Sequence, residues 1–162
     1  MDDPKNMPGH LARRFQQIAV ACFVAEVEKA GFDLTPVQYA ALAALDAHPG
    51  TDQIGLAGLI AYDRTTIGGV VDRLVQKGLT VREESPTDRR ARVLTLTPAG
   101  KKTLRAIGPA VAAAQRTMLR GLTAQEGRDL VRLLQKAVAG GNDLSRAPRR
   151  EMVGQGAARG RP

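Results

Sequence analysis

"DRTTIGGVVDRLVQKGLTVREESPTDRRARVLTLTPAG", residues 63–100, contains the change of pattern that decides the fold. Its first half repeats apolar side chains at helical spacing and ends at a glycine: Ile67, Val70, Val71, Leu74 and Gly78. Its second half alternates apolar and polar side chains over residues 79–84 and 91–97, and turn-forming residues separate the two runs. The stretch therefore predicts a helix followed directly by a two-stranded hairpin whose turn is rich in arginine.

Helical patterns surround this stretch on both sides. The expected helices cover residues 10–30, 36–48, 51–62, 64–78 and 98–120, and a last helix follows the capping box at 123–126. Thr35, Asp63 and Thr97 are the expected N-caps of the second, fourth and fifth helices, and Gly108-Pro109 predicts a kink in the fifth. The predicted fold is mainly α with one small β-hairpin, in the order four helices, hairpin, two helices.

Composition limits the kind of protein that this chain forms. Hydrophobic residues make up 43% and charged residues 25% of 162 residues, but the aromatic side chains are only two Tyr and three Phe, with no Trp. The core is therefore expected to consist of Leu, Val, Ile and Ala. A net charge of +8 and a pI near 10.4 indicate an anionic partner, either nucleic acid or an acidic membrane surface.

The residue inventory argues against several other classes. No run of about 18 apolar residues predicts a membrane span, and residues 1–8 lack the apolar run of a cleavable leader. The single cysteine, Cys22, excludes an internal disulfide and favours a cytoplasmic protein. Two histidines do not make a metal site, and without a phosphate-binding glycine loop or a carboxylate pair we expect neither an enzyme nor a cofactor.

Two short helices followed by a basic hairpin predict a winged helix-turn-helix. A helix fits the major groove of DNA, and a cationic hairpin can reach into the neighbouring minor groove. Arg64, Thr65 and Thr66 are expected at the amino end of the reading helix, where unpaired backbone N–H groups favour phosphate. Double-stranded DNA is therefore the expected partner, and the alternative is a basic hairpin that only faces solvent.

The same stretch resembles the reading helix and wing of MarR-type transcriptional regulators, and residues 10–139 match the helix order of that family. The most specific part is Asp88-x-Arg90 followed by "LTLTPAG". The resemblance implies that Arg90 enters the minor groove and that Asp88 holds it through charge-assisted hydrogen bonds, with help from Arg73. The complete set of expected DNA contacts is Arg64, Thr65, Thr66, Gly68, Gly69, Arg73, Asp88, Arg89, Arg90 and Arg92.

Gly68 and Gly69 depart from the family pattern, in which many members carry base-facing side chains at these positions. Two glycines inside a helix cost up to about 2 kcal/mol relative to alanine. They either let the helix approach the DNA backbone more closely, or shift base reading to neighbouring residues, or only permit close helix packing.

The resemblance also implies an obligate homodimer formed by the first and the last two helices. Independently of it, the last helices carry more apolar surface than the rest of the chain is expected to cover. The expected regions are residues 1–34 and 98–140 for dimerisation, 35–97 for DNA binding, here called the reading head, and a disordered basic tail at 141–162. A two-fold dimer would place its reading helices about 34 Å apart on a pseudo-palindromic operator.

Many proteins of this family respond to phenolic or aromatic acids, and residues 10–19, "HLARRFQQIA", are similar to members that control the breakdown of such acids. His10, Arg14 and Gln17 share one helix face, and Arg14 or the adjacent Arg13 can bind a carboxylate in a bidentate way. Gln38 and Tyr39 are the candidates for the opposite wall. The alternative is that these arginines form surface ion pairs or contact DNA phosphates.

A dimeric DNA-binding repressor released by a small aromatic or heteroaromatic acid is the function that these patterns predict. Two other functions remain as alternatives: an architectural DNA-binding protein without an effector, and a winged-helix module that binds an acidic protein. Cys22 invites a peroxide-sensing role, but its apolar neighbours favour a buried, inert thiol.

Overall fold

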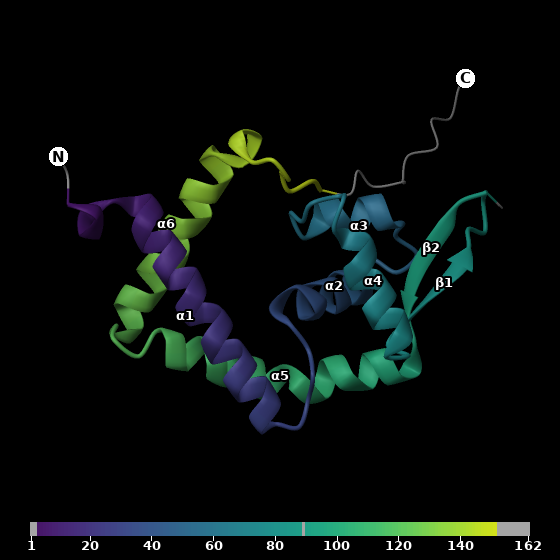
Figure 1. The fold of residues 1–162 in the computed structure, drawn as a ribbon, viewed down its shortest axis with the longest axis horizontal. Helices are drawn as coiled ribbons and strands as arrows, with labels where there is room; N and C mark the ends of the chain where they lie inside the picture. Colours follow the sequence, from purple (N-terminus) through teal and green to yellow (C-terminus); the bar gives the residue numbers. More distant parts are fainter. Residues whose placement is uncertain (1–2, 89, 152–162) are drawn as a thin grey trace, which may run out of the picture.

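The computed structural model describes residues 3–88 and 90–151. The helices and strands along this part of the chain are η1 (Pro4–Asn6), α1 (Pro8–Lys29), α2 (Pro36–Ala47), α3 (Gln53–Leu59), α4 (Ile67–Gln76), β1 (Thr80–Glu84), β2 (Arg92–Leu96), α5 (Pro98–Met118), α6 (Ala124–Gly140) and η2 (Asn142–Leu144) (Figure 1). The predicted fold class and element order are confirmed: a mainly helical chain carries one antiparallel hairpin, the wing, between α4 and α5.

Three of the predicted helix starts are confirmed by side-chain caps, those of α2, α5 and α6. Thr35 and Gln38 form both hydrogen bonds of a capping box at α2, and Thr123 and Glu126 do the same at α6. The Oγ1 of Thr97 accepts a hydrogen bond from the backbone N–H of Gly100 at the start of α5. Each cap satisfies backbone donors that a helix start would otherwise leave unpaired.

The core of the reading head is aliphatic, as the composition predicts. Its fully buried side chains come from α2, α3, α4 and β2: Leu42, Leu45, Leu56, Ile67, Val71, Leu74 and Leu94. The same core continues between α1 and α5 with Phe23, Val27, Ile107, Ala110 and Ala114. Figure 1 shows α5 running below the reading head and crossing α1, so this helix packs on both.

The apolar face of α6 is not covered within one chain. Leu133 and Val138 have exposed fractions of 52% and 65%, and Leu134 has 42%. On the first half of α1, Leu11 and Ile18 are each 47% exposed. Gly127 is the one residue of α6 that is buried. An amphipathic helix stabilises a fold by burying its apolar face, and α6 leaves that face to solvent in the single chain.

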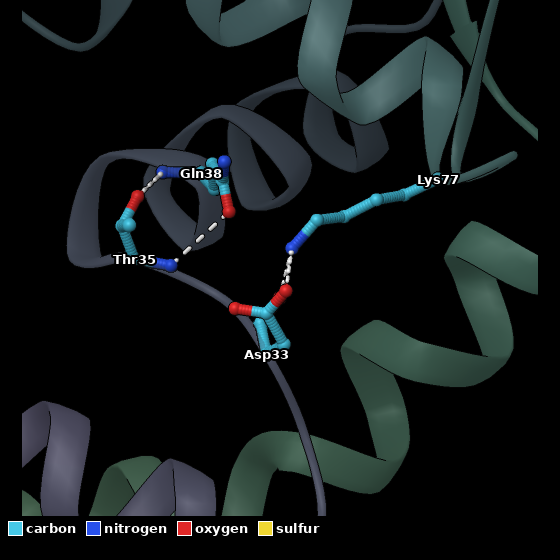
Figure 2. A network of polar contacts seen from close by, with 4 residues as sticks. All are labelled: Asp33, Thr35, Gln38 and Lys77. Atoms are coloured by element: carbon cyan, nitrogen blue, oxygen red, sulfur yellow. Dashed lines mark hydrogen bonds and ion pairs between the residues drawn. The ribbon is translucent and has the colours of Figure 1, made fainter.

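Two polar contacts join the carboxyl end of α4 to the segment before α2 (Figure 2). The Nζ of Lys77 donates to the backbone oxygen of Asp33 and, at 2.7 Å, to its Oδ2. The Lys77 ammonium lowers the pKa of Asp33 through this hydrogen bond and through its charge. Thr35, two residues further, caps α2, so one short segment fixes the ends of both helices.

The root of the wing depends on the first turn of α5. The backbone N–H of Thr97 donates to the carbonyl oxygen of Leu79, and its hydroxyl donates to that of Gly78 at 2.6 Å. A Cβ on Gly100 would lie 2.0 Å from the Leu79 oxygen. Only glycine fits at this position of "LTPAG", because any side chain would separate the wing from α5.

Three expectations about local structure need correction. Asp63 does not cap α4, because α4 begins at Ile67 after a turn that Asp63 starts. The helix expected over residues 51–62 is shorter, from Gln53 to Leu59. Residues 141–151, expected to be disordered, instead form η2 and a loop that the Asn142 side chain joins to the backbone of Arg149. The rest of the expected basic tail lies outside the described residues.

Replacing Gly100 with alanine is expected to lower the free energy of unfolding by about 2–3 kcal/mol, because the added Cβ overpacks against a backbone oxygen. Gly69→Ala is the matched control, since a Cβ there meets no atom within 4 Å. Inside a helix this control should raise stability by about 0.5–1 kcal/mol. Urea denaturation at one protein concentration measures both, and equal effects of the two variants would contradict the role of Gly100.

Candidate nucleic-acid interface

The turn before α4 is organised by one carboxylate. Oδ1 of Asp63 accepts hydrogen bonds from the backbone N–H of Thr65 at 2.9 Å and from its hydroxyl at 2.8 Å. The hydroxyl of Thr66 donates to the backbone oxygen of Asp63 at 3.1 Å. The backbone and side-chain hydrogen bonds from Thr65 lower the pKa of Asp63, and the nearby Arg146 guanidinium adds a smaller effect. Asp63 therefore stays ionised, and the turn stays formed, to a lower pH than for a free aspartate.

This turn presents the three residues that the sequence assigned to the amino end of the reading helix. Arg64, Thr65 and Thr66 are all exposed. Thr66 is the N-cap residue of α4, but its side chain makes no capping hydrogen bond there. Backbone oxygens take the place of a side-chain cap, because the N–H groups of Ile67 and Gly69 donate to the carbonyl oxygens of Asp63 and Thr66.

The two glycines of α4 have different surroundings. A Cβ on Gly68 would lie 3.3 Å from Nε2 of Gln53 in α3, so Gly68 permits close packing of the two helices. A Cβ on Gly69 would meet nothing within 4 Å, and Gly69 is exposed. Of the alternatives that the sequence leaves open, close helix packing fits Gly68 and close approach to an outside partner fits Gly69. Arg73, further along α4, is exposed.

Asp88 organises the tip of the wing through the backbone. Its Oδ1 accepts a hydrogen bond from the backbone N–H of Arg90 at 2.9 Å, and its carbonyl oxygen accepts one from Ala91 at 3.0 Å. The expected ion pair between Asp88 and the side chains of Arg90 and Arg73 is not formed among these described residues. A short turn can satisfy its own N–H groups this way, and the exposed Arg90 side chain keeps its donors for a partner. Arg89 lies outside the described residues.

The strands of the wing carry acidic residues below the basic tip. Arg92, another expected DNA contact, lies 3.5 Å from Oε1 of Glu84 across the hairpin, and both side chains are about 60% exposed. Oε2 of Glu83 accepts a hydrogen bond from the hydroxyl of Thr95. An exposed ion pair of this kind contributes little stability. The pair offsets the charge of Arg92, so the positive charge of the wing is concentrated at its tip.

Two anchors of the wing were not predicted from the sequence. The Nη2 of Arg82 in β1 donates to Oδ1 of Asp72 in α4 at 2.6 Å and lies 3.5 Å from Oε1 of Gln53 in α3. Leu94 in β2 exchanges backbone hydrogen bonds with the loop before α3: its N–H donates to Thr51, and its oxygen accepts from Gly50. The first contact fixes the wing to the reading helix, and the second fixes it to the loop before α3. An ion pair between residues four positions apart on one helix can be predicted from a sequence, but a pair between two separate helices or strands cannot.

The residues expected to bind an effector do not form one site in the single chain. Gln38 is buried and occupied in the α2 capping box, and Tyr39 packs on Phe23, with 5.9 Å between ring centres. Phe23 lies nine residues after Arg14, about 13 Å along the axis of α1, so the start of α1 is distant from α2. His10 is half-buried, and Nη1 of Arg13 donates to Oε1 of Gln17 on the helix surface.

Arg14 has different surroundings from Arg13. It lines a hollow of about 470 Å³ between α1 and α6, whose other walls are mostly apolar: Pro8, Leu11, Ala12, Phe15, Ile18, Leu130 and Leu134. A guanidinium beside an apolar hollow can receive a molecule with one carboxylate and one apolar body.

Cys22 is half-buried and packs against the hydrophobic core.

In the described part of the chain, no three His, Cys, Asp or Glu side chains gather closely enough to hold a metal ion. Among those same residues, no helix combines the length and the apolar character that crossing a bilayer requires.

Comparison with known proteins gives one consistent result. The model of the MarR family matches residues 32–91. The transcriptional repressor NicR of Pseudomonas putida is 31% identical over 136 residues, which are 84% of this chain and 85% of that protein. A putative transcriptional regulatory protein for the hcr operon of Thauera aromatica is 38% identical over 103 residues, 64% of this chain and 62% of that protein.

A solved structure extends the match to the whole fold. BpsR of Bordetella bronchiseptica, whose DNA binding is regulated by 6-hydroxynicotinic acid, is 29% identical with a TM-score of 0.78, over 85% of this chain and 96% of that chain. The residues that the family model matches include the turn before α4, the reading helix and the first strand of the wing. The chain belongs to the MarR family of DNA-binding transcriptional regulators.

Proposed function

We propose that this chain is a homodimeric repressor that a small aromatic or heteroaromatic acid releases from a pseudo-palindromic operator. The observation that carries the proposal is that the reading head holds two exposed arginines, one before α4 and one at the tip of the wing. Arg64 precedes α4, Arg90 lies at the tip of the wing, and the Arg82–Asp72 contact holds the wing to α4. In this arrangement α4 enters the major groove and Arg90 reaches the adjacent minor groove.

A second copy of the chain is the proposed cover for the exposed apolar face of α6. Leu133, Leu134 and Val138 are between 42% and 65% exposed, and side chains of this size are stabilised by burial. Leu11 and Ile18 of α1 are also exposed and line the same hollow as Leu134. The exposed apolar surface therefore includes parts of both α1 and α6. A two-fold pairing through this face would bring two reading heads to one duplex, which explains why the operator should be pseudo-palindromic.

The proposed effector site is the hollow beside Arg14. Its apolar walls suit an aromatic ring, and the Arg14 guanidinium suits a carboxylate. The hollow lies between α1 and α6, which are also the helices proposed to pair. A bound acid would therefore change how the two copies pack, and it would stabilise the arrangement in which the reading heads no longer match the groove spacing. The similarity to BpsR, which responds to a heteroaromatic acid, supports this class of ligand.

Replacing Arg90 with alanine is expected to weaken binding to the operator by about 10- to 100-fold, because one buried groove contact contributes about 1–3 kcal/mol. Fluorescence anisotropy with a duplex from the region upstream of its own coding sequence measures the weakening. Arg105→Ala is the matched control, since this exposed arginine bonds to Lys101 on α5, away from the wing. Unchanged binding by the Arg90 variant would contradict the proposed docking.

Competition with unrelated DNA separates a repressor from an architectural binder. A regulator should prefer its operator by at least about 10³-fold, whereas an architectural protein would bind both duplexes alike. No binding to either duplex at low salt would favour a module that binds an acidic protein.

Replacing Leu134 with glutamate is expected to convert the dimer into monomers, because the proposed pairing would bury an unpaired charge. Light scattering should give about twice the 17.3 kDa chain mass for the unmodified protein and a single chain mass for the variant. Lys136→Glu, which changes an exposed residue of the same helix, should remain dimeric. An unmodified protein that is monomeric at micromolar concentration would overturn the dimer.

Benzoates, hydroxycinnamates and nicotinates form the panel for the effector. At about 100 times its Kd, a binding acid should stabilise the fold by about 2.7 kcal/mol and raise Tm by several degrees. Arg14→Gln is expected to remove the shift, whereas Arg13→Gln should keep it because Arg13 pairs with Gln17 outside the hollow. The same acid should release the operator duplex. If no acid of the panel raises Tm, the effector site is wrong.

A further inference from the structure

The segment after α6, residues 141–151, is here called the C-terminal strap. It leaves the carboxyl end of α6 and returns to α3, on the same side of the reading head as the free end of the wing (Figure 1). Three arginines lie in it, Arg146, Arg149 and Arg150, and acidic residues lie only near its two ends, at Asp143 and Glu151. The function described above does not use this segment.

The strap has a defined internal structure. The Asn142 side chain accepts a hydrogen bond from the backbone N–H of Arg149 at 2.8 Å and donates one to the backbone oxygen of Arg149 at 3.1 Å. One amide side chain thus pairs with both polar groups of one residue, as a neighbouring β-strand would. This pairing closes residues 142–149 into a loop and lowers the conformational entropy that docking would otherwise cost.

The loop docks on α3 by backbone contact. The N–H of Arg150 donates to the carbonyl oxygen of Gly58 at 2.8 Å. A Cβ on Gly58 would lie 3.2 Å from the Cβ of Arg150, and Gly58 is buried under the strap. The absence of a side chain at Gly58 therefore permits the close approach.

Docking places the strap arginines beside the turn that precedes α4. The Nε of Arg146 lies 3.0 Å from Oδ2 of Asp63, whose other oxygen holds Thr65. Because Arg146 uses only Nε for this contact and its side chain is 88% exposed, its terminal amino groups can reach another oxygen. Arg64, Arg146 and Arg150 line one hollow of about 440 Å³, together with the hydroxyl-bearing Tyr62 and Thr65.

We propose that the C-terminal strap is a third DNA-binding element, which contacts backbone phosphates next to the base pairs read by α4. This inference rests on the proposed operator binding. Three guanidinium groups and one carboxylate give the hollow a positive charge, and guanidinium forks match the geometry of phosphate oxygens. The contacts carry no sequence information, so the strap increases affinity for every duplex and leaves base reading to α4 and the wing.

Salt dependence tests the proposal directly. In the full-length protein, the triple variant Arg146→Gln, Arg149→Gln and Arg150→Gln should reduce the slope of log K against log salt. The expected reduction is about 0.9 for each phosphate that the variant no longer neutralises, or about 2 to 5 for a dimer. Affinity for the operator duplex and for an unrelated duplex should fall by the same factor. The matched control removes three exposed cations elsewhere, Lys29, Arg105 and Lys136, and should keep the unmodified slope.

Asn142→Ala separates docking from charge. It keeps every arginine but removes both hydrogen bonds that close the strap, so its slope is expected to fall by a large part of the reduction in the triple variant. The proposal is overturned if the triple variant keeps the slope of the unmodified protein, or if Asn142→Ala keeps that slope while the triple variant does not. If the unmodified protein binds neither duplex, the regulator itself fails, and the strap proposal fails with it.

Discussion

The contact between the first turn of α5 and the turn after α4 is the constraint on which the rest of the molecule depends. Gly100 brings α5 against the Leu79 carbonyl, and Thr97 bonds to the carbonyls of both Gly78 and Leu79. This contact closes the wing at its root and attaches the reading head to the long helix that packs on α1. A displacement of α1 or α5 therefore moves α4 and the wing together, which is the mechanical condition for control of DNA binding from a distant site.

Charge along the reading head is divided between structure and binding. Asp63, Asp72 and Asp88 each use a carboxylate to fix a piece of backbone or an arginine, and none competes with the exposed cations at the probe tips. On the strands, Glu84 offsets the charge of Arg92, and Glu83 accepts a hydrogen bond from the hydroxyl of Thr95. The Lys and Arg side chains behind the net charge of +8 thus include cations used for structure and cations available to a polyanion. Net charge alone indicates the partner, but these pairings indicate which surface meets it.

Local signals in the sequence predicted most of the fold, because caps, glycine stops and periodicity act within one turn. Thr35, Thr97 and Thr123 cap helices where expected. Where the sequence failed, partners are separated along the chain. Arg82 with Asp72, Thr51 with Leu94, and Arg146 with Asp63 are contacts between elements that no periodicity reveals. The effector residues show the same limit: the sequence predicts that Arg14 shares a helix face with His10 and Gln17, but it does not reveal that Arg14 lines a hollow against α6.

The strap gives the reading head a third connection to the proposed dimer helices. The chain itself links the head to α1 before α2 and to α5 after the wing, and the strap runs from α6 through residues 141–151 to Gly58 in α3. A head held only at its two chain ends can rotate about the line between them, whereas a third attachment at α3 restricts that rotation. If α6 packs on a second copy of the chain, the position of α6 sets where the strap can dock. The same dimer contact sets the spacing of the two reading heads. The phosphates that the strap would contact therefore depend on that spacing. Affinity and head spacing would then respond together to a ligand between α1 and α6, although that ligand touches neither the wing nor the reading helix.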